Sequence, residues 1–375
     1  MMPCQPDFAE IAHTGGKVTI TVATQNGRRG HQVKYQHHGQ NKIVLLEIRI
    51  TYDGNQVGEL AFGEVPPPGW SYAHIASDTD GKFGHQCPAC NQYWRSDPWP
   101  TTCPYCGLQA HGLQFLSNAQ KIYLQQYSEK LREALGAAED GEYVIDLDAV
   151  ADAVGKTEEK PPFYYAEESQ QNKFDCRSCG AFNDILGYFG YCASCATRND
   201  LQEIETKTIP QIRDRINAGG PYEACAKDAV AAFDSFTGRY IVQLLHRIPM
   251  TPARKSRFEK TRFHNLRKVL EDLKNAFDID ICEGLKPADV EFAALLFHRR
   301  HVYEHKGGEA DQKYLDDSGD IAVRPKQAIH ETQDSAHRLA DLVDRMAANL
   351  HRGFHEIFPP DKVRIEANAK RQRNG

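Results

Sequence analysis

The sequence of 375 residues has no long apolar run, and this absence excludes a helical membrane span. Its apolar stretches fall short of the roughly 18 to 20 residues that such a helix needs. The first residues also lack a basic segment followed by an apolar one, so we expect no secretory signal. An excess of positive charge is missing as well, because 45 Lys and Arg stand against 51 Asp and Glu, for a net charge of −6. The chain as a whole is therefore not a polycationic nucleic-acid binder.

Cysteine is plentiful, and its arrangement indicates metal binding. Eight of the eleven cysteines form four Cys-x-x-Cys pairs: Cys87/Cys90, Cys103/Cys106, Cys176/Cys179 and Cys192/Cys195. In a chain without an export signal, thiols stay reduced, and such pairs are metal ligands far more often than disulfides. We therefore expect a cytoplasmic protein with no membrane partner.

The spacing of the pairs predicts two zinc ribbons, at residues 81–112 and 169–200. Twelve residues separate the two pairs in each ribbon, which suggests an internal duplication. Four thiolates close a tetrahedron around zinc and leave no position for water, so we expect two structural ions without a catalytic role. The aromatic residues of the ribbons have two interpretations, because they either form small cores or stack on bases.

The rest of the sequence predicts a multidomain fold with β structure first and helices last. Residues 1–80 are rich in β-branched residues and turn signals and form a β-rich N-terminal domain. Residues 113–168 read as one helix, with a capping box at Ser117 and Gln120, followed by an acidic linker. Residues 205–358 form an all-α domain, and residues 359–375 form a basic tail.

Four amphipathic helices are expected in the all-α domain. Apolar residues follow the helical period over residues 221–249, 266–277 and 287–306 and again around 336–354. Proline opens or follows several of these segments, as is typical at helix ends. Short connections between such helices predict a bundle.

The third of these helices carries the candidate catalytic residues. Residues 298–305 contain three His, two Arg and one Glu directly after an apolar stretch. One interpretation is the His-x-x-Glu-His pattern of zinc metallopeptidases, with His301 and His305 as ligands and Glu304 activating water. Against it, the helix is expected to stop at Gly307, no downstream helix offers a carboxylate as third ligand, and the flanking arginines oppose a cation.

The second interpretation rests on Arg300 and His305, which are separated by four residues. This spacing resembles the Arg-x4-6-His motif of HEPN-domain ribonucleases, a family that favours Asn, Asp or His after the Arg, here His301. The following segments are also similar to one bacterial branch of the family: Gly307-Gly308, Lys313-Tyr314-Leu315 and Gly319-Asp320. The resemblance covers about residues 205–358. Gly307 stands where the toxin branch regulated by modification has a Tyr, so that regulation is not implied.

The resemblance implies a metal-independent endoribonuclease acting on RNA, with a role as a toxin or antiphage effector. His305 would take the proton of the 2′-hydroxyl, and Arg300 would stabilise the charge on the phosphate. Five positions turn a helix by roughly 140°, so Arg300 and His305 do not naturally face one target. The resemblance implies a homodimer, formed through the helical domain, that brings two copies of the motif into one cleft. His301 and Glu304 would position groups, and Arg299 also satisfies the motif. A protein inhibitor or sensor is a further possible partner.

The runner-up is a non-catalytic module that binds RNA or protein, because HEPN domains also occur as inactive scaffolds. Residues 247–274 carry nine Lys or Arg against three acids, which is either an RNA-backbone surface or a solvated helix face. The metallopeptidase ranks third.

Overall fold

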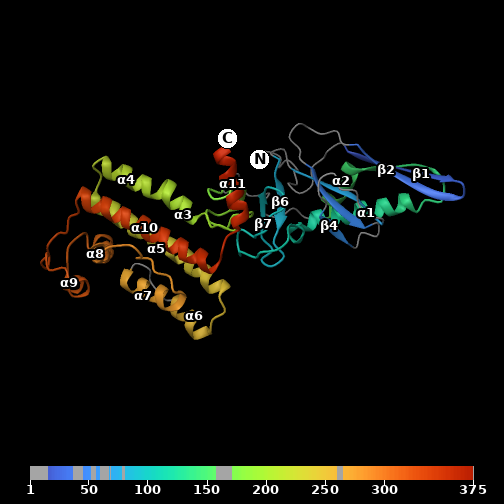
Figure 1. Ribbon diagram of the computed structural model, residues 1–375. Coiled ribbons are helices and arrows are strands. Elements are labelled where there is room, and N and C mark those ends of the chain that lie inside the picture. Colours follow the sequence, from blue (N-terminus) through green and yellow to red (C-terminus); the bar gives the residue numbers. More distant parts are fainter. Residues whose placement is uncertain are drawn as a thin grey trace. The chain divides into compact units, whose positions relative to one another are not determined.

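Two parts of the chain fold around separate cores (Figure 1). The computed structural model describes residues 16–36, 45–51, 56–59, 67, 69–77, 81–157, 171–259 and 265–374. Unit 1 comprises residues 1–197 together with 361–375, and unit 2 comprises residues 198–360. The helical unit is thus inserted between the second cysteine cluster and the last helix of the chain.

Unit 1 begins with antiparallel strands. β1 (Lys17–Gln25) and β2 (Arg28–Gln36) form a hairpin through Asn26 and Gly27, whose positive φ angles of 53° and 70° are typical of a tight two-residue turn. β8 (Gly141–Asp146) pairs with the other edge of β1. A second sheet has the order β4-β3-β5, with these bounds: β3 Leu45–Thr51, β4 Val57–Glu59 and β5 Trp70–Ala76.

The core of this β region lies between the strands and two helices. Alternate residues in the first part of β1 are buried, namely Val18, Ile20 and Val22, as expected for a strand with one face covered. Helices α1 (Asn118–Leu135) and α2 (Leu147–Thr157) supply the opposing apolar side chains. The predicted capping box at the start of α1 is confirmed by two reciprocal hydrogen bonds between residues 117 and 120.

The expected acidic linker is structured as far as it is described. Residues 141–157 form β8 and α2, and Ile145 and Val154 are buried in the core. The apolar residues that stand between the acidic ones pack in the same core as β1 and α1. Residues 158–170 lie outside the described part of the chain.

A four-stranded sheet joins the two cysteine-rich segments. Its order is β6-β7-β10-β9, with these bounds: β6 Phe83–Gln86, β7 Tyr93–Ser96, β9 Gln171–Asp175 and β10 Phe182–Leu186. The central pair, β7 and β10, comes from different ribbons and aligns Arg95 with Asp184. The Arg95 guanidinium donates to the buried Asp184 carboxylate at 2.8 Å, so the two ribbons form one body.

The basic tail forms helix α11 (Lys362–Asn374) and packs on the second cysteine cluster. The Asp361 N–H donates to the Cys195 carbonyl at 2.8 Å, and Ile365 packs against the four cysteines. A Cβ on Gly180 would come within 2.9 Å of the Asn368 side chain, so glycine permits this close approach.

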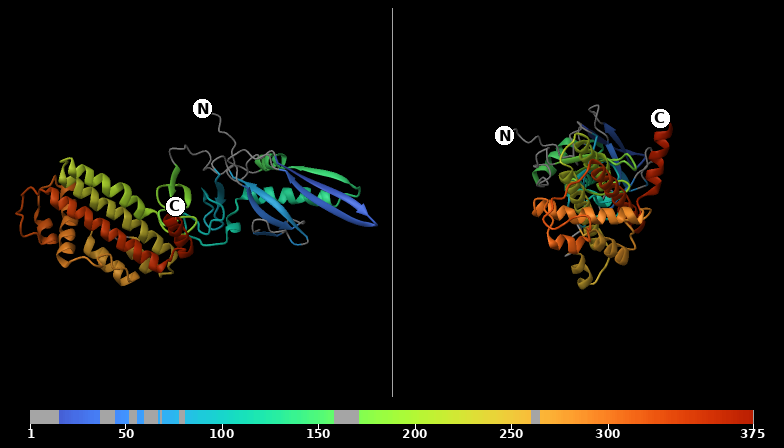
Figure 2. Two further views of the ribbon diagram at one scale, coloured as in Figure 1. Left: turned by 45° about the horizontal axis from the view of Figure 1, so that its top comes forward. Right: turned by 90° about the vertical axis from the view of Figure 1, so that its left-hand side faces the viewer.

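Unit 2 is helical, as the sequence predicts. Its longer helices are α4 Ile209–Asn217, α5 Tyr222–Arg247, α7 Leu266–Phe277, α8 Pro287–His305 and α10 Gln333–Ile357. Shorter elements are α3 Asp200–Glu203, the π-turn η4 Ile204–Thr208, α6 Pro252–Glu259 and α9 Gln312–Ser318. α5 contacts α4, α8 and α10, and α5 and α10 run side by side in Figures 1 and 2.

Aromatic rings fill the core of unit 2. Phe233 of α5 meets Phe297 of α8 edge to face, with ring centroids 5.5 Å apart, and Tyr240 meets Phe354 of α10 in the same way. The Tyr240 hydroxyl lies 2.7 Å from Nδ1 of His351, and burial lowers the pKa of His351 to about 3. None of the described helices is long and apolar enough to cross a membrane.

The boundaries of unit 2 predict that residues 198–360 fold as an isolated fragment. In this fragment, Phe233→Ala should lower the free energy of unfolding by about 3 to 5 kcal/mol, because the ring is fully buried and its loss leaves a cavity. Val242→Ala on the same helix is the control and should change it by less than about 0.5 kcal/mol, because Val242 is 61% exposed. Urea unfolding followed by circular dichroism measures both. A fragment without a cooperative transition would contradict the boundaries.

Candidate metal centres and catalytic motif

Each cysteine cluster brings four sulfur atoms to tetrahedral spacing. In each cluster the ligand atoms lie within 4.8 Å of one another. Four sulfur pairs are 3.6 to 3.7 Å apart: Cys87–Cys106, Cys90–Cys103, Cys176–Cys195 and Cys179–Cys192. A tetrahedron with Zn–S bonds of about 2.3 Å has sulfur–sulfur edges of about 3.8 Å. All eight predicted ligands are therefore grouped as the sequence spacing indicates.

The same backbone turn is repeated four times, once for each cysteine pair. The residue after each second cysteine has a positive φ between 58° and 73°: Asn91, Gly107, Gly180 and Ala196. Its N–H donates to the carbonyl of the first cysteine at 2.7 to 3.0 Å. This tight turn directs both sulfur atoms of a pair to one side, where a single ion can bind them.

The donor set of the two clusters fits zinc. Burial raises the pKa of the Cys103 thiol, so four thiolates at this spacing need a cation to coexist. Soft thiolate donors in a closed tetrahedron are typical of structural zinc. Each Cys4 group could hold one zinc ion, and neither leaves an open position for a reacting molecule.

Some aromatic residues of the ribbons are buried in their cores, and others are at least partly exposed, as stacking on bases requires. Trp94 is fully buried, and its ring meets Phe115 edge to face at 5.3 Å. Tyr105 donates its hydroxyl hydrogen to the Tyr93 carbonyl. These two residues belong to the core, whereas Tyr188 on the second ribbon is exposed.

The predicted catalytic residues lie at the C-terminal end of α8. Nη2 of Arg300 is 2.8 Å from Oε2 of Glu304, one helical turn later. Nε2 of His305 lies 3.9 Å from the same oxygen atom. The rings of His301 and His305 are in contact, with centroids 4.7 Å apart. Four of the five predicted residues therefore form one cluster, although the rotation along the helix alone separates Arg300 from His305.

Arg299, the alternate arginine, is placed differently from its neighbour. Its guanidinium donates to the Tyr314 hydroxyl and to the carboxylates of Asp320 and Glu331, at 2.9 to 3.3 Å. Both carboxylates are buried, and hydrogen bonds to them raise the pKa of Arg299 against the opposing effect of burial. Arg299 thus ties α8 to α9 and to the segment before α10.

A cavity of about 310 Å³ opens beside the cluster, between α8 and α9. His298 and His301 line it from α8, and Lys313 and Asp317 line it from α9. Burial lowers the pKa of His298, and the charges of Arg267 and Lys313 lower it further, against the opposing effect of Asp317. These effects together favour the neutral form of the His298 imidazole.

The basic stretch 247–274 is described in part, because residues 260–264 lie outside the described chain. Among its described cations, Arg247 lies over the Phe358 ring. Arg267 forms an ion pair with Glu291, and Lys274 forms one with Asp278 at 3.1 Å. Both pairs are exposed and contribute little to stability.

Within the described residues, the two Cys4 clusters are the groups of three or more His, Cys, Asp or Glu whose ligand atoms lie within 4.8 Å of one another. His301, Glu304 and His305 do not form such a group, so the metallopeptidase interpretation lacks support there. Comparisons of the chain with protein-family models, curated proteins and solved structures find no match. Its function is therefore inferred from the residues themselves.

The sequence alone does not indicate that Arg299 forms ion pairs with Asp320 and Glu331. Asp320 and Glu331 lie 21 and 32 positions after Arg299, and no local spacing links them to it. The docking of α11 also lacks a sequence signal, because this helix has few apolar residues.

We predict two zinc ions per chain. Elemental analysis of the purified protein should find this ratio, and Cys176→Ser should retain one ion and unfold at a lower temperature, because three thiolates do not close the site. Cys282→Ser is the matched control, since Cys282 lies outside both clusters, and should retain two ions. One ion or none in the unmodified protein would contradict the assignment.

Proposed function

We propose that the chain is a metal-independent endoribonuclease of the HEPN class. The observation that carries this proposal is the convergence of Arg300 and His305 on one carboxylate oxygen of Glu304. Both side chains belong to the Arg-x4-His motif, and they lie at the end of a helix within a helical unit.

The arrangement supplies the groups that RNA cleavage needs. The imidazole of His305 is 55% exposed and can accept the 2′-hydroxyl proton of a bound strand. The 2′-oxygen then attacks the adjacent phosphorus, and the bond to the 5′-oxygen breaks. The departing oxygen takes up a proton from water, and His305 returns its proton to water. The guanidinium of Arg300 stabilises the charge that develops on the phosphate. Glu304 holds both groups, and His301 positions His305 through their ring contact.

Arg300 is the better candidate than Arg299 for contact with phosphate. Both side chains are largely buried, with 17% and 14% exposed, but their partners differ. Arg299 is held by two buried carboxylates. Among the described residues, the ion-pair partner of Arg300 is Glu304, whose side chain is 35% exposed. Nε of Arg300 is buried without a hydrogen-bond partner among the described residues, so the guanidinium retains donor capacity.

We further propose that the protein acts as a homodimer through its helical unit, as a cytoplasmic toxin or defence effector. A single chain already holds Arg300 and His305 together, so a dimer would place two such motifs in one cleft. A protein inhibitor or a sensor would then control access to the cleft. These statements rest on the family resemblance and on the exposed end of α8.

Alanine variants test the catalytic assignment. Arg300→Ala and His305→Ala should each reduce cleavage of a labelled RNA at least about 100-fold, since each removes one chemical role. Arg300→Lys should also fail, because a point charge does not bind phosphate in a bidentate manner. Products should end in 2′,3′-cyclic phosphate, and cleavage should persist in EDTA while the protein retains its zinc.

The controls separate catalysis from folding. His301→Ala should reduce cleavage less than His305→Ala, and all variants should keep the melting temperature of the unmodified protein. Unchanged cleavage by both alanine variants would refute the assignment. RNA binding without cleavage by the unmodified protein would favour the binding module, and loss of activity in EDTA would favour a metalloenzyme.

Mixing experiments test the dimer. A tenfold excess of His305→Ala chains, exchanged into the unmodified protein, should place most unmodified chains in mixed dimers. If two motifs share one centre, the activity per unmodified chain should then fall severalfold. Activity that stays proportional to the number of unmodified chains would show that each chain carries an independent site.

A further inference from the structure

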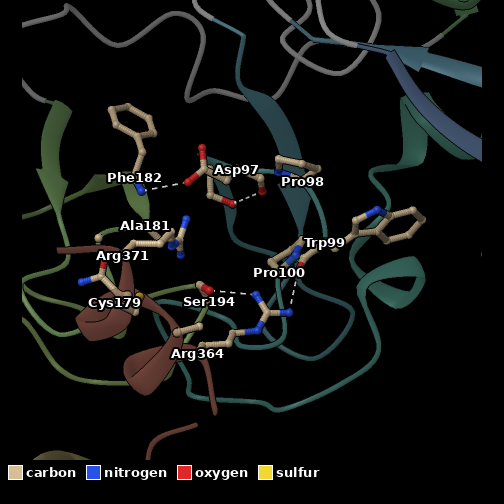
Figure 3. A pocket seen from close by; sticks show the side chains of 14 residues that line it. Asp97, Pro98, Trp99, Pro100, Cys179, Ala181, Phe182, Ser194, Arg364 and Arg371 are labelled. Carbon is tan, nitrogen blue, oxygen red and sulfur yellow. Dashed lines mark hydrogen bonds between the residues drawn. The ribbon is translucent and has the colours of Figure 1, made fainter. Parts of the chain in front are cut away.

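A pocket in unit 1 is distinct from the catalytic motif. Its volume is about 280 Å³, and three segments line it: residues 96–100 of the first ribbon, residues 179–182 with Ser194 of the second ribbon, and helix α11. Figure 3 shows that it is bordered by the Asp97 carboxylate and by the Arg364 guanidinium. The pocket therefore exists only because the two ribbons share a sheet and α11 packs on them.

Two arginines line the pocket from one face of α11. Arg364 and Arg371 are seven positions apart, or two helical turns. Arg364 is held in place, because it donates to the Ser194 hydroxyl at 2.7 Å and to the Trp99 carbonyl at 3.4 Å, and its Nε lies 3.5 Å from Asp361. Arg371 is exposed and has no hydrogen bond or ion pair among the described residues.

The one carboxylate in the lining is already compensated. Asp97 Oδ1 accepts a hydrogen bond from Lys82 Nζ at 2.6 Å, and Oδ2 accepts one from the Phe182 backbone N–H at 3.0 Å. Asn368 adds a neutral amide, which donates to the Ser178 carbonyl at 3.4 Å. Apart from the cluster cysteine Cys179, the lining therefore has two arginines against one carboxylate, and this net positive charge favours an anion although the whole chain is acidic.

The shape of the pocket favours a phosphate over a base. Figure 3 shows the rings of Trp99 and Phe182 directed away from Arg364, so neither presents a stacking face beside it. Residues 361–374 carry five Lys or Arg against two acids. Guanidinium groups match the geometry of phosphate oxygens, and a strand of RNA offers one phosphate at each nucleotide.

We propose that this pocket binds a backbone phosphate of single-stranded RNA between Arg364 and Arg371. The site itself rests on the pocket and its charges, whereas the choice of RNA as the source of the phosphate rests on the proposed function. In the full protein, unit 1 would capture the strand that unit 2 cleaves. Substrate capture and cleavage would then reside on separate units.

A second role for these arginines has to be separated from RNA binding. A zinc ion with four thiolates carries a net charge of about −2, and α11 lies against the second cluster. Cations on α11 could serve only to offset that charge. Loss of such compensation would lower zinc retention and melting temperature, whereas loss of an RNA contact would leave both unchanged.

The test measures binding of a fluorescent single-stranded 2′-O-methyl RNA to the full, zinc-loaded chain. This probe lacks the attacking hydroxyl, so binding is observed whether or not the protein is a nuclease. Arg371→Ala should weaken binding about tenfold and reduce the slope of log K against log salt by about 0.7. Arg373→Ala is the matched control, because Arg373 lies on the same helix but not in the pocket, and should change the affinity less than twofold.

A second variant removes no existing contact. Ala367 lines the pocket, and Ala367→Glu places a negative charge there while both arginines remain. It should weaken binding at least as much as Arg371→Ala, with the zinc content unchanged.

Four outcomes would overturn the proposal. These are absence of binding by the unmodified protein, equal losses for Arg371→Ala and Arg373→Ala, unchanged affinity in Ala367→Glu, and zinc loss without affinity loss in Arg371→Ala. Inorganic phosphate or adenosine monophosphate is then added at the same concentration as the phosphate groups of the RNA. Displacement of the RNA under this condition would assign the pocket to a free phosphate ligand instead. Failure of cleavage with intact binding would refute only the proposed nuclease.

Discussion

The spacing of eight cysteine sulfur atoms is the constraint on which unit 1 depends. Four thiolates at 3.6 to 3.7 Å repel one another unless a cation lies between them, and burial strengthens that repulsion. Metal binding would therefore be coupled to the folding of each ribbon. Because β7 and β10 pair across the two ribbons, loss of either ion would also weaken the shared sheet and the surface on which α11 packs.

Arg299 and Arg300 are adjacent near the end of α8, but the carboxylates that pair with Arg299 are buried and the one that pairs with Arg300 is partly exposed. Arg299 points to carboxylates from distant parts of the chain, and their mutual attraction compensates the cost of burying all three charges. Arg300 points to Glu304 of its own helix, where solvent reaches the pair. The structural network around Arg299 fixes the orientation of α8, and this in turn positions Arg300 and His305 for the proposed chemistry.

The insertion of unit 2 between residues 197 and 361 gives the chain two units with different sources of stability. Unit 2 has a core of interlocking aromatic rings, such as Phe233 with Phe297, that is large enough to stabilise a helical fold without metal. The ribbons have cores too small for this and depend on their clusters. Helix α11 follows unit 2 in the sequence but belongs to unit 1, because it packs on the second cysteine cluster.

Local patterns in the sequence determined the parts of this protein that depend on neighbours within a few positions. These are the eight cysteines of the two clusters, the capping box at Ser117, the β-rich character of the N-terminal region and the four predicted helices, because cysteine spacing, cap chemistry and apolar period act over one or two turns of chain. Only the tertiary structure decided the pairing of β7 with β10, the partners of Arg299 and the packing of α11. Each depends on groups that are tens to more than a hundred positions apart, and their contact is settled by burial and charge in the folded chain, not by local spacing.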